Sequence, residues 1–291
     1  EMAGLLRSWD INIIQQFKPF SDEHSRKSLD LFAPDFGVAI EHIGLWAHRN
    51  REENDHYLKY KLCQGLGIRL VQIFGDDWHS RMHAVEGVLK SIFKKQEQLV
   101  GARECEIVGG YSFELRKFLE ENHIQGFASG THFALKYHNN IVASITVKQI
   151  NPSGAGPPVE GFWELSRYCI KADYKLPGAF ERLFKRFICE FQPKEIISFS
   201  DHRWSIGGLY KKNGFKLDGE IKPDYSYVHE SKTLIRLSKR MFRKERILRK
   251  FGLDSSFLEF TESQLMEVIG HFRIYDAGKD KWVLDTAPKS C

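Results

Sequence analysis

The chain has 291 residues, of which 42% are hydrophobic and 13% aromatic, and this composition excludes wholesale disorder. No apolar run reaches about 18 residues, so we expect no membrane span. Lysine and arginine number 43 against 38 acidic residues, and the resulting charge of +5 identifies no partner by itself. The length suits roughly two domains.

Five cysteines are scattered along the chain, and none of them forms a CxxC pair. An odd number of widely spaced cysteines favours free thiols in a reducing cell interior over a disulfide framework or a zinc site. We therefore expect a cytoplasmic protein.

Residues 1–96 predict a compact α/β unit. The run IRLVQIF is continuous and rich in branched side chains, as in a buried strand, and Gly67 before it predicts the end of a helix. The sequence PDFG predicts a tight turn between two strands. The expected elements are the end of a helix over 2–8, strands over 11–17, 28–33, 37–43 and 68–74, and helices over 56–67 and 78–95.

Residues 104–235 predict a second unit of mixed helices and strands, and the polar bridge KQEQLVGARE joins it to the first. A hairpin turns at Asn139–Asn140, and a loop rich in glycine and proline follows it. The expected elements are strands over 104–108, 162–170 and 194–199, the hairpin over 131–147, and helices over 111–122, 179–191 and 204–212. Residues 236–291 form a third segment, with a helix near 262–269 and the short strand FRIYD.

The third segment opens with the basic run RLSKRMFRKERILRK, which holds eight basic residues and one acid. Apolar residues at helical spacing predict that one side of this run packs inward. The other side is either an ordinary solvated helix face or a surface that follows nucleic-acid phosphates. On the second interpretation, Arg240, Arg243 and Lys244 contact DNA.

Two carboxylates and an imidazole lie within SLDLFAPDFGVAIEHIGLWAH, residues 28–48. In a hairpin with a short turn, Asp30 and Glu41 lie across from each other. Two such carboxylates can hold Mg²⁺, and the His48 imidazole can accept a proton near neutral pH. From the residues alone, these three side chains are either a metal site with a proton acceptor or three unrelated surface groups.

The stretches LDLFAPDFGVAIEHIGLWAH and HYLKYKLCQGLGIRLVQIFGDDW resemble a known catalytic domain. It belongs to phage homing endonucleases related to the very short patch repair endonuclease, in the PD-(D/E)xK superfamily. The resemblance covers residues 28–78. It implies a restriction-endonuclease-like domain over 1–96, with Asp30 and Glu41 as metal ligands and His48 as the histidine of the WH element.

The same resemblance implies that His56 and Lys59 touch the scissile phosphate. The expected activity is hydrolysis of phosphodiester bonds in double-stranded DNA by a homing-type endonuclease that depends on Mg²⁺, with Mn²⁺ as a substitute. Asp30 and Glu41 then hold the metal, and the metal and His48 activate the attacking water. Because one chain has one such centre, a double-strand cut needs a homodimer or two successive events. The cellular setting is the host of a phage.

The stretch FWELSRYCIKADYKLPGAFERLFKRFI and the later SFSDHRWSIGGLYKKNGF resemble the acetyltransferase-like fold, above all the Mom-type phage DNA-modification proteins. The expected architecture is thus an α/β (α+β) multidomain chain: a nuclease domain, an acetyltransferase-like mixed-sheet domain over 104–235 that positions DNA, and a basic helical tail over 236–291. In such folds a glycine-containing turn leads into a helix whose N–H groups hold a pyrophosphate. Gly178 and Tyr210 match that turn and the tyrosine that protonates the leaving thiolate.

Four further residues of this second unit invite a functional interpretation. Arg167, Asp201, Arg203 and Trp204 form either a polar site or a salt-bridged loop. Aromatic rings beside cations suit base stacking and phosphate contact, so Arg167, Arg203 and Trp204 are predicted DNA contacts.

Two other functions stay open beside the nuclease. One is a group transferase that uses an acyl-CoA donor to modify a DNA base or a small amine. The other is a catalytically silent DNA-binding protein, because Ile43 stands where the nuclease pattern has a lysine or an asparagine.

Overall fold

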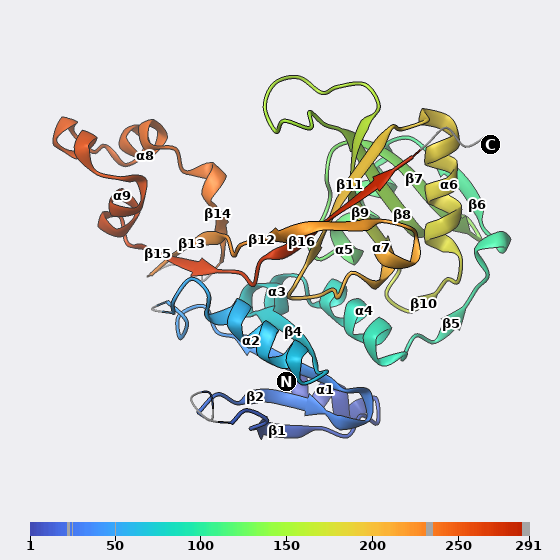
Figure 1. The fold of residues 1–291 in the computed structure, drawn as a ribbon, viewed down its shortest axis with the longest axis horizontal. Coiled ribbons are helices and arrows are strands. Elements are labelled where there is room, and N and C mark those ends of the chain that lie inside the picture. The colour runs from blue at the N-terminus through green and yellow to red at the C-terminus, as the bar shows by residue number, and fades with distance from the viewer. Residues whose placement is uncertain (22–23, 25, 50, 231–234, 287–291) are drawn as a thin grey trace. The chain divides into compact units, whose positions relative to one another are not determined.

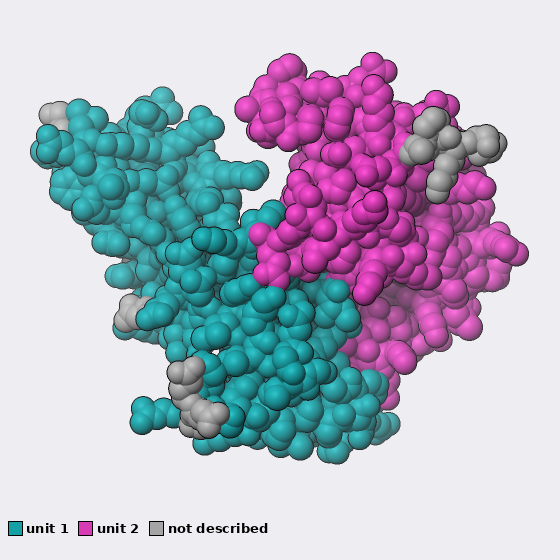
Figure 2. All heavy atoms as spheres, in the orientation of Figure 1, with its two compact units in different colours: residues 1–80, 201–206, 221–279 teal, residues 81–200, 207–220, 280–291 magenta. Residues whose placement is uncertain are grey.

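The computed structural model describes residues 1–21, 24, 26–49, 51–230 and 235–286. The chain forms two compact units (Figure 2). Unit 1 comprises residues 1–80, 201–206 and 221–279, and unit 2 comprises residues 81–200, 207–220 and 280–291. The two units interleave along the chain, whereas the sequence predicted three consecutive segments divided near residues 96 and 235.

Unit 1 begins with a four-stranded sheet in the order β1-β2-β3-β4, with β1–β2 and β2–β3 antiparallel and β3–β4 parallel (Figure 1). Gly37 closes the turn between β2 and β3 in the left-handed conformation, with φ 60°. The elements are α1 (Met2–Ser8), β1 (Ile14–Phe17), β2 (Leu29–Ala33), the 3₁₀ turn η2 (Pro34–Phe36), β3 (Val38–Ile43), α2 (Asp55–Gly65) and β4 (Arg69–Phe74). These bounds agree closely with the predicted ranges.

The helix predicted over 78–95 is two helices, α3 (Gly75–Ser80) and α4 (Met82–Phe93). Arg81 between them has φ −131° and ψ 29°, which is not helical. The chain passes from unit 1 to unit 2 at this break. The apolar spacing continues through the break, so periodicity alone gives no sign of it.

The C-terminal part of unit 1 is a small antiparallel sheet in the order β14-β13-β15, with two helices on one face. Tyr227 on that face packs with Leu265 and Met266. Val228 and Ile274 point to the opposite face and pack with the core around Phe74. The small sheet is therefore an inner layer of unit 1. Its elements are β13 (Tyr225–His229), β14 (Leu237–Ser238), η4 (Lys239–Met241), α8 (Lys244–Phe251), η5 (Ser255–Glu259), α9 (Glu262–Val268) and β15 (His271–Tyr275).

Unit 2 is built on a seven-stranded mixed sheet in the order β12-β16-β11-β9-β8-β7-β6 (Figure 1). Helix α6 packs on one face through Phe180, Leu183 and Phe187, and α5 packs on the other through Leu115 and Leu119. The strands are β6 (Glu106–Gly109), β7 (Thr131–Tyr137), β8 (Asn140–Gln149), β9 (Phe162–Ile170), β11 (Glu195–Asp201), β12 (Lys216–Ile221) and β16 (Lys279–Asp285). The other elements are α5 (Phe113–Asn122), α6 (Ala179–Phe191), α7 (Gly208–Lys212), η3 (Ala102–Glu104), and the short parallel pair β5 (Gln98–Leu99) and β10 (Tyr174–Lys175).

Within the described residues, no helix is long and apolar enough to cross a membrane. The four described cysteines, Cys63, Cys105, Cys169 and Cys189, are free thiols, and the fifth lies outside the described residues.

Leu265 anchors α9 to the small sheet of unit 1, and its side chain is fully buried. We expect Leu265→Ala to lower the free energy of unfolding by about 2–5 kcal/mol, because the truncation leaves a cavity among neighbours that cannot fully collapse. Urea unfolding followed by circular dichroism measures this loss. Leu258→Ala, at an exposed position in the same part of the unit, should change stability by less than about 0.5 kcal/mol. Equal losses in the two variants would contradict the packing described here.

Candidate functional site

The hairpin of β2 and β3 brings Asp30 and Glu41 together. The register pairs Leu31 with Ile40, so Asp30 and Glu41 are opposite neighbours. The Asp30 N–H donates to Glu41 Oε1 at 3.0 Å, and the His42 N–H donates to Asp30 Oδ2 at 2.9 Å. Gln16 Nε2 donates to Asp30 Oδ1 at 3.2 Å. Both carboxylates are therefore held in place by donors from their own sheet.

Lys59 on α2 reaches the second oxygen of Glu41. Its Nζ lies 2.6 Å from Glu41 Oε2, and the two side chains are 15% and 8% exposed. Burial raises the pKa of Glu41, and the nearby Lys59 ammonium only partly offsets this. The structure thus contains a nearly buried ion pair at the place where the sequence predicted a metal ligand and a phosphate contact.

The two predicted histidines lie against each other. The rings of His48 and His56 stack with centroids 5.2 Å apart, and the His56 ring also meets Phe74 edge to face. Burial, followed by the neighbouring His48, lowers the pKa of His56 to about 3. Burial is also the main cause of the lowered pKa of His48. Burial therefore favours the neutral form of both rings.

A cavity of about 390 Å³ opens beside Asp30 within unit 1. It is lined by acids, imidazoles, amides and an indole, among them Glu1, Asp30, His42, Trp78 and His79. Trp78 Nε1 donates to Glu1 Oε2 at 3.1 Å. These groups can donate hydrogen bonds to a small polar molecule and accept hydrogen bonds from it.

Sequence reasoning missed two residues of this cluster. His42 holds Asp30 through its backbone N–H and is one of the residues that line the cavity. Gln72 is buried on β4 in register with Glu41 and donates to the His56 carbonyl at 3.0 Å. One polar residue inside the apolar run RLVQIF was the available signal for Gln72.

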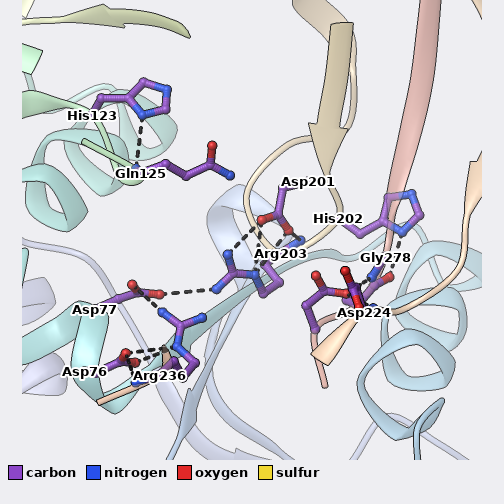
Figure 3. A network of polar contacts seen from close by, with 12 residues as sticks. Asp76, Asp77, His123, Gln125, Asp201, His202, Arg203, Asp224, Arg236 and Gly278 are labelled. Carbon is purple, nitrogen blue, oxygen red and sulfur yellow. Dashed lines mark hydrogen bonds and ion pairs between the residues drawn. The ribbon is translucent and has the colours of Figure 1, made fainter. Parts of the chain in front are cut away.

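Arg203 belongs to a buried charge network of unit 1 (Figure 3). Its NH2 lies 2.7 Å from Asp201 Oδ2, and its NH1 lies 3.2 Å from Asp77 Oδ2. Arg236 reaches the same helix α3, with Nε 2.8 Å from Asp76 Oδ1 and NH2 2.5 Å from Asp77 Oδ1. Burial opposes the charge of Asp201, but Arg203 outweighs it and lowers the pKa of that carboxyl.

The structure places three predicted DNA contacts where they bind protein atoms instead. Arg203 and Trp204 are 6% and 9% exposed, so neither offers a free surface to a base or a phosphate. In unit 2, Arg167 Nε donates to the Gly126 carbonyl at 3.0 Å, and its NH1 donates to the Ser166 carbonyl at 2.7 Å. Arg203 therefore belongs to a salt-bridged loop, the alternative that the sequence left open, and Arg167 binds carbonyls of its own unit.

The basic run forms α8 and the turn before it. Ile247 and Phe242 are buried, as the helical spacing predicted. Arg236 and Lys239 are paired with Asp76 and Asp224, and Lys244 Nζ donates to the Leu258 carbonyl. The exposed cations that remain in this run are Arg240, Arg243, Arg246, Arg249 and Lys250.

In unit 2, the neighbouring parallel strands β9 and β11 pair over only three residues each. Their register runs from Glu195–Phe162 to Ile197–Glu164 and then stops, although both strands continue. Beyond that point Ser198 Oγ lies 2.8 Å from the Leu165 carbonyl and 2.9 Å from the Tyr210 hydroxyl. The sheet therefore opens beside Tyr210, and burial raises the pKa of that phenol.

No family profile and no curated protein sequence matches the chain. Solved structures do match. The ribosomal-protein-S18-alanine N-acetyltransferase of Escherichia coli shows 10% identity and a TM-score of 0.36, with 64% of this chain and 96% of that chain covered. An N-acetyltransferase of Staphylococcus aureus Mu50 shows 10% identity and a TM-score of 0.36, with coverages of 62% and 98%. A GNAT family acetyltransferase of Elizabethkingia anophelis with acetyl-CoA bound shows 12% identity and a TM-score of 0.32. The match covers 63% of this chain and 99% of that chain.

These matches correct the predicted function. The matching structures are acetyltransferases, which are transferases and not hydrolases, and several of them hold acetyl-CoA or CoA where the sequence predicted Mg²⁺ or Mn²⁺ for this chain. The nuclease resemblance finds no support in these comparisons, and the predicted function of a metal-dependent endonuclease is wrong. The chain has a mixed α/β fold with acetyltransferase neighbours. At these identities and TM-scores, the likeness transfers no ligand or activity to this chain.

The ion pair of Lys59 and Glu41 leads to a stability prediction. Lys59→Met should lower the free energy of unfolding by about 3–5 kcal/mol, because it leaves a buried carboxylate without its partner. Chemical unfolding at neutral pH measures this, and adding Glu41→Gln to the variant should recover much of the loss. The control is Lys212→Met, which breaks an exposed pair with Glu181 and should cost about 0–1 kcal/mol. A neutral Lys59→Met would show that the pair does not form.

Because His56 is buried and its pKa is lowered, we predict that the protein loses stability in acid. Its folded pKa of about 3 lies below the ordinary value of 6.5, so between these values the unfolded chain takes up a proton that the folded chain does not. Stability must then fall as the pH drops from 6.5 towards 3, by at most about 1.4 kcal/mol per pH unit for one such group. His56→Gln should make this decline shallower in unfolding measured across pH. Some decline should persist, because burial also lowers the pKa of His123 in unit 2 to about 3. An unchanged slope in the variant would contradict a buried neutral His56.

Proposed function

We propose that the chain is a DNA-binding protein that docks helix α8 on the phosphate backbone of double-stranded DNA. The observation that carries the proposal is the set of five exposed cations on α8 and the turn before it. None of the five has a described carboxylate within ion-pair distance. Arg236 and Lys239 of the same run are paired with acids, whereas no described acid neutralises the five exposed cations.

The position of Arg243 argues against an ordinary solvated face. It is the N-cap residue of α8, where the helix dipole disfavours a positive charge, and its side chain makes no capping bond. Serine, threonine, aspartate or asparagine would stabilise that end. Arg249 and Lys250 lie in the last turn, where the dipole does favour cations, so helix stability explains those two but not Arg243.

The inner side of α8 keeps the cations in fixed positions. Ile247 is buried against the small sheet of unit 1, and the Lys244 ammonium donates to the Leu258 carbonyl. Arg246 and Arg249 are three residues apart within α8, so their side chains are neighbours on the helix surface, and Arg243 precedes them at the N-cap. A guanidinium can bind a phosphate through two parallel N–H donors. Two neighbouring arginines on a packed helix, with a third at its N-cap, therefore suit phosphate contact better than flexible lysines would.

Phosphate contacts carry no sequence information, so α8 contributes affinity for DNA and not specificity for a DNA sequence. Acyl-group transfer is the other enzymatic function that the sequence left open.

The test is the binding of a labelled duplex, followed by fluorescence anisotropy at several salt concentrations. Five phosphate contacts release counterions, so the logarithm of the affinity should fall with the logarithm of the salt concentration with a slope of about −4 to −5. The double variant Arg246→Glu/Arg249→Glu should weaken binding by at least about tenfold and flatten that slope, because two attractive contacts become repulsive.

The matched control is Arg103→Glu/Lys185→Glu, which makes the same change of charge at exposed positions of unit 2. It should bind DNA nearly as well as the unaltered chain. Equal losses in the two double variants would mean that net charge, and not the face of α8, drives binding. Such a result would contradict the proposal, as would binding that does not respond to salt.

A further inference from the structure

Unit 2 exposes two large aromatic side chains where helix α5 begins. Phe113 is the first residue of the helix and is 78% exposed, and Tyr111, two residues before it, is 61% exposed. Single apolar side chains on a protein surface need no explanation, whereas neighbouring ones mark binding sites. These two aromatic residues have no role in the core of unit 2, so we ask what could bind to them.

The chain that carries the two rings is fixed in place. Ser112, between them, is the N-cap residue of α5, and its Oγ accepts from the Leu115 N–H at 3.0 Å. Leu115 is buried and packs α5 against the sheet of unit 2. The backbone at both rings therefore loses little further freedom when a ligand binds, which favours affinity.

Phe127, in the loop after α5, extends the exposed rings into a larger aromatic surface. Its ring meets the Tyr111 ring edge to face, with centroids 6.0 Å apart. On its inner side it stacks on the ring of His132 at 5.4 Å, and His132 is 2% exposed. The His132 Nδ1 lies 3.0 Å from the Thr146 hydroxyl, so this supporting ring is itself held. The surface is thus backed by the interior of unit 2.

The charges of α5 leave one arginine beside these rings without an acid. Each of the three acids of the helix has a cation partner: Glu114 with Lys136 at 2.9 Å, Glu120 with Arg81 at 3.2 Å, and Glu121 with Lys117 at 3.8 Å. Arg116 is exposed, and no described acid lies within ion-pair distance of it. Its guanidinium carbon lies 5.4 Å from the centroid of the Phe127 ring. A positive charge therefore accompanies the aromatic rings.

Exposed rings with a free guanidinium beside them match the chemistry of an unpaired nucleotide. A base of any identity can stack on an aromatic ring, and an arginine attracts the backbone phosphate or stacks on the base itself. Bases inside a duplex already stack on one another, so such a surface selects the unpaired form.

We infer that unit 2 binds single-stranded DNA on the aromatic face formed by Tyr111, Phe113, Phe127 and Arg116, with unpaired bases stacked on the rings. This face adds contacts to bases that the cations of α8 do not make. The inference does not rest on DNA binding by α8, because α8 belongs to unit 1 and the aromatic face belongs to unit 2.

The experiment is the binding of a fluorescein-labelled thymidine oligonucleotide of about 15 nucleotides to the full chain, followed by anisotropy. Every protein in the series carries Arg246→Glu/Arg249→Glu, so that α8 contributes little. In this background Tyr111→Leu/Phe113→Leu should weaken binding at least about tenfold, because the variant keeps apolar side chains but removes the two rings. An unlabelled duplex of the same length should displace the oligonucleotide poorly.

Two further variants isolate stacking from other causes. Tyr111→Trp/Phe113→Trp should retain binding, since indole rings also stack on bases. Leu99→Ala should leave binding unchanged, because Leu99 is an aliphatic residue of unit 2 that is 71% exposed and lies outside the aromatic face. Circular dichroism establishes that each variant is folded.

The outcomes that would overturn the inference are equally specific. No binding of the oligonucleotide by the protein with an intact aromatic face would end it. Undiminished binding by the folded leucine variant would show that the rings do not stack on bases, and an equal loss in Leu99→Ala would show that the effect is not confined to this face.

Discussion

Unit 1 depends on a small set of charges buried between distant segments of its sequence. Asp76 and Asp77 open helix α3, and Arg203 and Arg236 reach them from positions more than 120 residues further along the chain. Both guanidinium groups also lie over the Phe74 ring, at 5.0 and 4.1 Å. Removing charges from water is costly, so such a network is worth little unless every partner is present. Here each partner is present, and the network joins three pieces of chain into one unit.

The same network explains why the segment 201–206 belongs to unit 1. The Gln72 N–H donates to the Arg203 carbonyl at 3.0 Å, and Arg69 NH2 donates to the Trp204 carbonyl at 3.0 Å. The segment thus lies along β4 and continues its hydrogen bonding. The arginine and the tryptophan that suggested a nucleic-acid surface in the sequence are consequently interior residues. Within residues 236–250, the cations that have no described carboxylate partner are exposed on α8 and on the turn before it.

Short-range features of the structure were predictable from the sequence. The turn at Gly37 and the alternation of the flanking strands set the register of Asp30 against Glu41, since both depend on neighbours within about a dozen residues. The buried side of α8 followed from helical spacing. Long-range partners were not predictable. Asp201 lies two residues before Arg203, but nothing near Arg203 in the sequence indicates that its other carboxylate partner is Asp77.

The order of synthesis matters for the sheet of unit 2, because β16 is its last strand along the chain. It lies between β12 and β11 in the sheet, yet the ribosome makes it only after residues 222–278, which belong to unit 1. An interior place in the sheet therefore stays vacant while more than fifty residues of the other unit are synthesised. During that interval β11 and β12 expose unpaired backbone edges, which attract foreign strands. We therefore expect a chaperone to help the nascent chain. A chain that stops before residue 279 would lack β16, the strand through which β12 joins β11 in the sheet.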